Sequence, residues 1–235
     1  MKKAGLPDPL AVLLIGTLLS WVPARATQGL ETVQVTASRR AESTFDVPVA
    51  SDVIGRDEIR AAVPQTVMDA LRGQAGAYVQ QTTPGQGVVI LRGLKGSEVL
   101  HVVDGFRLNN AIFRNAPNQY VALVDSQSLS RIEIVRGPMS ALYGSDAMGG
   151  VVQMLTLEPR FEGNEWQADA LLRTMYGSAD DSTLSRAQGA FGHERLVVSG
   201  GATYQDVNDR RAGGGEELPY TGFTARAADA KVRAM

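Results

Sequence analysis

The last third of the chain alternates between apolar and polar side chains. In the stretch WQADALLRTMYG, Trp166 begins a face of alanine, leucine and threonine, while Gln167, Asp169 and Arg173 lie on the other face. The same period of two recurs in SRAQGAFG, RLVVSGGATYQ and RAADAKVRAM. Because successive side chains of a strand point to opposite faces, this period predicts about four β-strands between residues 160 and 235.

The predicted connections between these strands alternate in length. A medium loop is expected at residues 176–183, a tight turn at 192–194, and a long, charged, glycine-rich loop at 206–222. Long strands joined by turns that are short at one end and long at the other are typical of a transmembrane β-barrel. A soluble β-meander over a globular core also fits the alternation, so the period alone leaves both architectures open.

The middle of the chain, residues 46–159, combines short apolar runs with helix signals and predicts a compact mixed α/β unit. Thr66 and Asp69 have the spacing of a capping box, so a short helix should follow Thr66 and end at Gly73 or Gly76. Strands are expected at residues 88–93, 99–108 and 131–137. Within the second run, Asp104-Gly105 predicts a tight hairpin turn.

A glycine-rich segment, RIEIVRGPMSALYGSDAMGGVVQML, spans residues 131–155. A phosphate-binding loop would require a lysine and a hydroxyl residue after its last glycine, whereas Val151 follows Gly150 here. The glycines therefore predict a tight chain reversal. We expect a one-turn helix with Pro138 at its first position and Gly144 at its end, followed by a close backbone approach or a positive φ at Gly149-Gly150.

The N-terminus has the features of a secretory signal peptide over residues 1–26. Two lysines precede an apolar run at residues 10–22, and Ala24 and Ala26 form a small-x-small cleavage site. A signal anchor is the alternative, but the apolar run would span only about 20 Å as a helix, which is less than a bilayer core of about 30 Å. The chain is therefore expected to leave the cytoplasm.

Residues 27–45 are polar and predict a flexible segment. Inside it, ETVQVTA alternates like a strand that has no partner nearby in sequence. It could be an edge strand of this domain or a strand that adds to the sheet of another protein. The residues concerned are Glu31, Thr32, Val33, Gln34, Val35, Thr36 and Ala37.

Composition narrows the range of functions. The chain has 235 residues, a net charge of −2, no cysteine and two histidines. Disulfides, thiolate metal sites and cysteine nucleophiles are thereby excluded, and neither a nucleic-acid surface nor a histidine metal centre is expected. Ser140, Ser145 and Asp146 have no histidine near them in sequence, so we expect neither an enzyme nor a cofactor.

Several of these motifs together resemble the plug domain of TonB-dependent outer-membrane receptors. The glycine-rich segment, LRG at residues 91–93, VVDGFRLNN at 102–110 and ETVQVTA occur in the family's order along residues 31–157. The strands after residue 165 resemble the first strands of the family's barrel. One departure is QMLTL at residues 153–157, where the family commonly has Asn-Ile-Ile-Thr-Lys.

The resemblance implies an α+β plug domain over residues 46–159, followed from residue 160 by the first antiparallel strands of a transmembrane β-barrel. The family's barrel has 22 strands, of which this chain would contain about the first four. The implied function is energised uptake of a scarce bulky ligand, such as an iron–siderophore, haem or cobalamin, across the outer membrane of a Gram-negative bacterium. The implied partners are that ligand, outer-membrane lipid and the energy-transducing protein TonB.

The resemblance also assigns roles to residues. Residues 31–37 match the TonB box, which makes pairing with a partner strand the favoured interpretation of ETVQVTA. Arg92 and Arg136 match plug arginines that pair with glutamates of the barrel wall, a pairing that the forked guanidinium suits. Two surface arginines at strand ends are the alternative.

The loops around residues 82–86 and 108–120 are candidates for contact with the ligand, since aromatic and amide side chains suit a large polar molecule. Solvent exposure explains the same composition. The candidate residues are Thr83, Gln86, Asn109, Asn110, Phe113, Arg114 and Tyr120.

About four strands cannot close a barrel, and an open edge in hydrocarbon leaves backbone groups unpaired. We therefore expect a fragment that cannot transport alone. A soluble periplasmic plug-like binding or interaction module is the rival interpretation. The sequence does not identify the ligand.

Overall fold

The computed structural model describes residues 49–110 and 115–234. The predicted signal peptide at residues 1–26 and the segment at 27–45, including the proposed TonB box at 31–37, lie outside the described residues. These assignments stay predictions.

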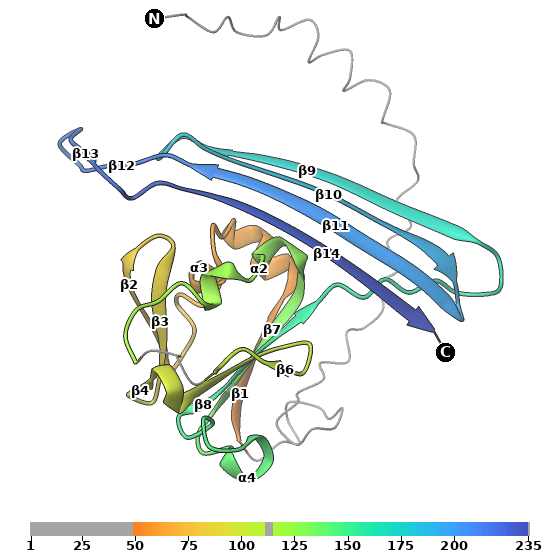
Figure 1. The fold of residues 1–235 in the computed structure, drawn as a ribbon, viewed down its shortest axis with the longest axis horizontal. Helices are drawn as coiled ribbons and strands as arrows, with labels where there is room; N and C mark the ends of the chain where they lie inside the picture. Colours follow the sequence, from red (N-terminus) through yellow and green to blue (C-terminus); the bar gives the residue numbers. More distant parts are fainter. Residues whose placement is uncertain (1–48, 111–114, 235) are drawn as a thin grey trace, which may run out of the picture. The chain divides into compact units, whose positions relative to one another are not determined.

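A mixed five-stranded sheet forms the centre of the α/β unit (Figure 1). Its strands, in spatial order, are β1 (Ala50–Gly55), β7 (Leu129–Arg136), β8 (Gly150–Thr156), β5 (Val99–Val103) and β6 (Phe106–Arg107). Only β5 and β8 pair in parallel, and the other neighbours are antiparallel. Asp104 and Gly105, between β5 and β6, both have positive φ, which confirms the predicted hairpin turn.

A four-stranded antiparallel sheet follows, in the order β14-β11-β10-β9 (Figure 1). Its members are β9 (Gln167–Gly177), β10 (Ser182–His193), β11 (Leu196–Val207) and β14 (Phe223–Ala234). The four predicted strands are confirmed. The predicted loop at residues 206–222 contains a small hairpin of its own, because β12 (Arg210–Arg211) pairs with β13 (Glu217–Leu218).

This sheet buries polar side chains on one face and exposes large apolar side chains on the other, which is the reverse of a sheet in a soluble protein. Arg186, Thr203 and Gln205 are buried, whereas Phe191 is 53% exposed and Val232 is 68% exposed. The rings of Trp166 and Phe191 stack on the exposed face, with centroids 4.8 Å apart. An apolar outer face over a polar inner face is the pattern of a barrel wall and argues against a soluble meander.

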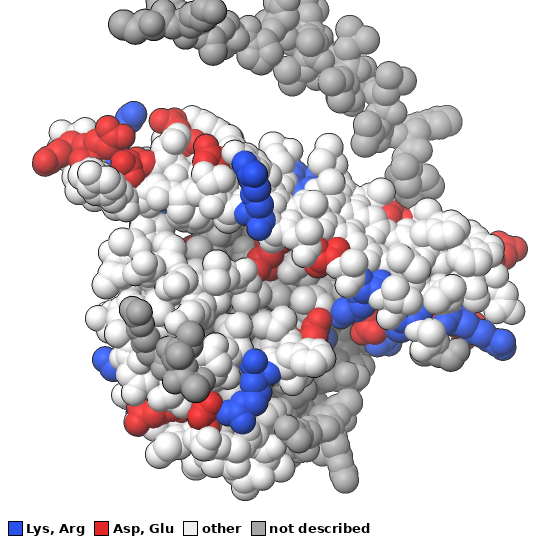
Figure 2. Space-filling model, in the orientation of Figure 1, with Lys and Arg blue, Asp and Glu red and all other residues white. Residues whose placement is uncertain are grey.

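Charged side chains are spread over the surface in small groups of mixed sign on the face that Figure 2 draws. Uncharged surface separates these groups. Among the described residues, no helix is both long enough and apolar enough to cross a membrane.

Short elements complete the α/β unit. A three-stranded antiparallel sheet contains β2 (Ala77–Thr83), β3 (Gln86–Leu91) and β4 (Leu94–Lys95). The helices are α2 (Arg56–Ala62), α3 (Val67–Ala70), α4 (Ser140–Tyr143) and the 3-10 turns η2 (Gly96–Glu98), η3 (Val121–Leu123) and η4 (Ser126–Ser128). The predicted capping box is confirmed, since the Thr66 N–H donates to Asp69 Oδ2 at 3.0 Å.

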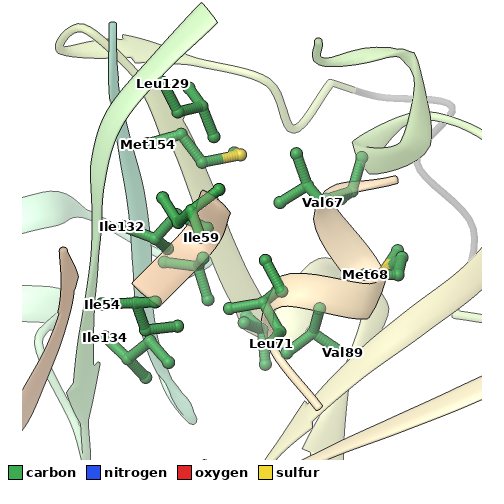
Figure 3. Close-up of a cluster of buried hydrophobic side chains, with 14 of the residues drawn as sticks. Ile54, Ile59, Val67, Met68, Leu71, Val89, Leu129, Ile132, Ile134 and Met154 are labelled. Atoms are coloured by element: carbon green, nitrogen blue, oxygen red, sulfur yellow. The ribbon is translucent and has the colours of Figure 1, made fainter. Parts of the chain in front are cut away.

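The apolar core lies where the mixed sheet, the helices and β3 meet (Figure 3). Ile132 and Ile134 come from β7 and Met154 from β8, and they pack with Leu71 and Val89, all five being fully buried. This core confirms the predicted α/β unit and provides a rigid body on which the surface loops are held.

The turn around Pro138 differs from the prediction. Helix α4 begins at Ser140 with Met139 as its N-cap, so Pro138 is not its first residue. The reason is that the Gly137 N–H donates to the Gly149 carbonyl and the Met139 N–H to the Ala147 carbonyl, which holds this stretch in a ladder. The helix ends at Gly144, as predicted.

The close backbone approach predicted at Gly149-Gly150 is confirmed. Gly150 has a φ of +153°, and a Cβ atom there would overlap the Val135 carbonyl oxygen. At Gly149 a Cβ atom would lie 2.8 Å from the Leu94 Cβ atom.

Candidate functional site

Two adjoining clefts lie where the β2–β3 hairpin approaches the four-stranded sheet. One cleft, of about 370 Å³, is lined by Thr83 and Gln86 of the hairpin together with Gln119 and the segment 220–223. The other, of about 410 Å³, shares Gln119 with it and continues along residues 122–126. Amide, hydroxyl and aromatic groups thus converge here, which suits a large polar ligand. We name this pair the apical cleft.

The structure therefore brings Thr83 and Gln86 together, from among the candidate ligand residues. The sequence interpretation missed the sheet-side lining, Tyr220 and Phe223. Both follow the glycine-rich run in the long loop, and Tyr220 is almost fully exposed. An exposed aromatic residue in a long loop was the signal that could have identified it.

Asn109, a candidate for ligand contact, has a structural role in this structure. Its side chain is only 9% exposed, and its Oδ1 accepts the His101 N–H at 2.9 Å while its Nδ2 donates to the Val99 carbonyl at 2.9 Å. The amide thus takes the place of a strand along the edge of β5, and its polar atoms are not available to a ligand in this structure.

The remaining candidates have varied positions. Asn110 is exposed, and Tyr120 is half-buried and packs against the apolar core. Phe113 and Arg114 lie outside the described residues, so their role stays a prediction.

Arg92 and Arg136 lie close together on the α/β unit. Arg136 donates to Asp52 of β1 and to the Ala75 carbonyl. The Arg92 guanidinium lies beside Gly137, the residue after Arg136. The partners found for Arg136 belong to the α/β unit itself, and the pairing of either arginine with a wall carboxylate stays a prediction.

A third cleft, of about 440 Å³, lies at the loop end of β9 and β10. Gln65 connects its two sides, because its Nε2 donates to Asp180 Oδ2 at 2.6 Å and its Oε1 accepts from Arg210 Nη2 at 3.1 Å. Burial acts to raise the pKa of Asp180, but hydrogen bonds from Ser182 and Gln65 outweigh it, so the pKa lies below the ordinary value. Asp180 is therefore a carboxylate near neutral pH.

Ion pairs join the α/β unit to the four-stranded sheet at two points that sequence reasoning did not identify. Arg186 of β10 pairs with Asp125 at 3.0 Å, and Lys231 of β14 pairs with Asp104 at 3.1 Å. Burial acts to raise the pKa of Asp104, but hydrogen bonds from Thr156 and the charge of Lys231 hold it below the ordinary value. The polar inner face of the sheet is thus matched to carboxylates of the α/β unit.

Within the described ranges, no group of three or more histidine, aspartate or glutamate residues is placed to hold a metal ion. The arrangement offers polar groups for recognition in the clefts and ionic attachment at the junction between the two parts.

Comparison with known proteins gives a consistent result. Residues 43–151 match the family described as the TonB-dependent Receptor Plug Domain. The vitamin B12 transporter BtuB of Vibrio vulnificus strain CMCP6 is 31% identical over 205 residues, which cover 80% of this chain and 32% of that protein. The iron-regulated outer membrane virulence protein of Vibrio cholerae is 34% identical over 157 residues, or 64% of this chain and 23% of that protein.

Solved structures share the fold. The hemophore receptor HasR of Serratia marcescens, solved with its hemophore and heme, has a TM-score of 0.68 at 22% identity and is matched over 80% of this chain and 29% of its own. The ferric yersiniabactin uptake receptor FyuA of Yersinia pestis has a TM-score of 0.58 at 20% identity, with 78% and 28% covered. This chain spans about a third of the length of the curated relatives that it matches first.

Proposed function

Because this chain belongs to the TonB-dependent outer-membrane receptors, with its plug domain over residues 43–151, we propose that it takes part in the energised uptake of a bulky ligand. The observation that carries the proposal is the apical cleft. It lies between the rigid plug and the polar face of strands whose other face is apolar and exposed.

The proposed ligand is a large polar molecule of the iron–siderophore, haem or cobalamin type. Each part of the apical cleft has about the volume that holds part of such a ligand, and amide groups such as Gln86 and Gln119 supply donors and acceptors. Cobalamin is the first ligand to test, because relatives at 31% and 34% identity are vitamin B12 transporters.

The proposed location is the outer membrane. The exposed apolar face of β9, β10, β11 and β14 supports insertion in lipid, and it argues against a soluble periplasmic module. The aromatic pair Trp166 and Phe191 lies near one end of the strands, and Tyr176 and Tyr204 lie toward the other. Aromatic residues at both ends of an apolar band suit the two membrane interfaces.

The proposed source of energy is TonB, which would capture residues 31–37 as an added strand. Proline at Val35 tests this part, because proline removes a backbone donor and so breaks a ladder of hydrogen bonds. Proline at Ala41, in the same polar segment but outside residues 31–37, is the matched control.

Uptake is measured with the complete coding sequence expressed in a Gram-negative host that lacks its own receptors for the tested ligands. Labelled cyanocobalamin, a ferric siderophore and haem are supplied in turn. We expect one of them to accumulate, Val35→Pro to abolish accumulation and Ala41→Pro to leave it intact. Absence of accumulation with all three ligands, or full uptake by Val35→Pro, would contradict the proposal.

A further inference from the structure

Arg186 is the most deeply buried charge on the inner face of the four-stranded sheet. Its side chain is 4% exposed, and each of its three nitrogen atoms donates a hydrogen bond. Nη1 reaches Asp125 and Thr203 at 3.0 Å, Nη2 reaches Asp229 at 2.7 Å, and Nε reaches Gln188 at 3.1 Å. Of these partners only Asp125 belongs to the plug.

Asp125 fixes a segment of the plug. Its Oδ2 accepts from Arg186 and from the Thr203 hydroxyl at 2.6 Å, while its Oδ1 accepts the Gln127 N–H at 2.9 Å and so caps η4. The next residue, Ser126, donates to the Pro64 carbonyl just before α3. Through one carboxylate, two strands of the wall therefore hold a segment that is tied to the helical part of the plug.

Two arginines of the plug lie beside this contact, since Arg56 and Arg60 of α2 line one small cavity together with Arg186. Burial, together with the charges of Arg60 and Arg186, lowers the pKa of Arg56 to about 10, although the carboxylates of Asp57 and Asp169 act in the opposite direction. The plug thus presents Arg56 toward Arg186 of the wall, and Asp125 is the plug carboxylate that pairs with Arg186. Asp229 cannot replace it as an attachment, because Asp229 is itself on the wall strand β14.

The same carboxylate lines the apical cleft. Asp125, Ser126 and Thr203 form part of the lining of its 410 Å³ portion, together with Gln119. A ligand group that enters there meets the residue that attaches the plug to the wall.

We propose that Asp125 is a positioning residue, an ionic latch that holds the plug on the strand wall through Arg186 and that is exposed to the contents of the apical cleft. The latch rests on the proposed function, in which the plug must be held in place and yet released under load. Removal of the Asp125 charge leaves Arg186 buried without its plug partner and opposed to Arg56, so the plug separates locally from the wall.

The test uses the absence of cysteine from these 235 residues, and any cysteine encoded beyond them is replaced by serine. Ser126→Cys is a reporter: Ser126 lines the cleft, but it is only 4% exposed, so its labelling is slow until the latch segment, residues 125–127, leaves the wall. Val152→Cys is the matched reporter in the plug core, which reacts only when the plug itself unfolds. Labelling by a membrane-impermeant maleimide is followed in outer-membrane vesicles without ligand or TonB. The receptor is expressed from its complete coding sequence.

Asp125→Asn keeps an oxygen that can cap η4 but removes the charge, and it should raise the labelling rate of Ser126→Cys at least fivefold, with Val152→Cys unchanged. Arg186→Gln should have an effect of the same size, and the double variant should exceed neither single variant. Arg56→Gln, added to Asp125→Asn, should lower the rate again, because it removes the repulsion. Lys231→Gln, which breaks the more exposed ion pair with Asp104, should change the rate less than twofold.

A smaller increase in Asp125→Asn, equal acceleration of both reporters, or no suppression by Arg56→Gln overturns the latch. Since neither ligand nor TonB is present, this result is independent of the uptake assay, and failure of either proposal can be recognised separately.

Discussion

Replacing Asn109 with alanine separates a structural role from a ligand contact. The alanine would leave the His101 N–H and the Val99 carbonyl, both at the buried edge of β5, without their side-chain partner. A buried polar group that loses its partner costs about 1–3 kcal/mol, so two such groups cost roughly 3 kcal/mol after partial relaxation. We therefore expect Asn109→Ala to destabilise the plug strongly.

The assay is the labelling of Val152→Cys in the plug core under native conditions, where the rate follows the population of opened plug. A loss of about 3 kcal/mol corresponds to labelling that is roughly 100-fold faster, since each 1.4 kcal/mol is a factor of ten. Gln80→Ala is the matched control, because it removes an exposed amide on β2, and its rate should stay within about twofold of the parent. If Asn109→Ala left the labelling rate unchanged but weakened ligand uptake, the structural role would be refuted and a ligand contact restored.

Three further predictions concern the plug. Burial lowers the pKa of His101 from 6.5 to about 4. Between these pH values the folded plug keeps the ring neutral, whereas the unfolded chain takes up a proton. The free energy of unfolding should therefore be full above pH 6.5 and fall by about 3 kcal/mol between pH 6.5 and 4. Unfolding of His101→Gln over the same pH range checks this, and an equally steep loss in that variant would contradict it. Gly150→Ala forces a methyl group onto the Val135 carbonyl at positive φ and should abolish the folded plug, as measured by protease resistance; normal resistance would show that the strand ladder can shift. Thr66→Ala removes the hydroxyl half of the capping box of α3 and should cost about 1 kcal/mol, seen as a small increase in Val152→Cys labelling, whereas an unchanged rate would mean that packing and the Asp69 half of the box fix this helix.

Local patterns in the sequence predicted the elements of this fold well. The period of two located β9, β10, β11 and β14, because each strand has one face in a polar environment and one in an apolar environment. The capping box and the Asp104-Gly105 turn were also predictable, since each depends on residues at most three positions apart.

Features that depend on distant residues could not be predicted in this way. Asp125 and Arg186 are 61 positions apart, and the sequence places Arg186 on a polar face without indicating its partner. Asn109 appeared to belong to an exposed polar loop, but the short β6 leaves the edge of β5 incomplete and the amide completes it. The prediction that Pro138 begins a helix was wrong for a similar reason. Its neighbours Gly137 and Met139 donate hydrogen bonds to the Gly149 and Ala147 carbonyls, which lie across the turn.

The position of β8 in the mixed sheet has a consequence for how the protein is made. Gly150–Thr156 is the last strand of that sheet along the chain, yet it lies between β7 and β5 in space. Until it emerges, no ladder of hydrogen bonds joins the β1–β7 pair to the β5–β6 pair, although side chains of β5 and β7 share an apolar cluster, and long-range pairing of this kind is slow. The ladder of the mixed sheet is therefore completed only after residue 156 has been synthesised, so this sheet closes late along the chain.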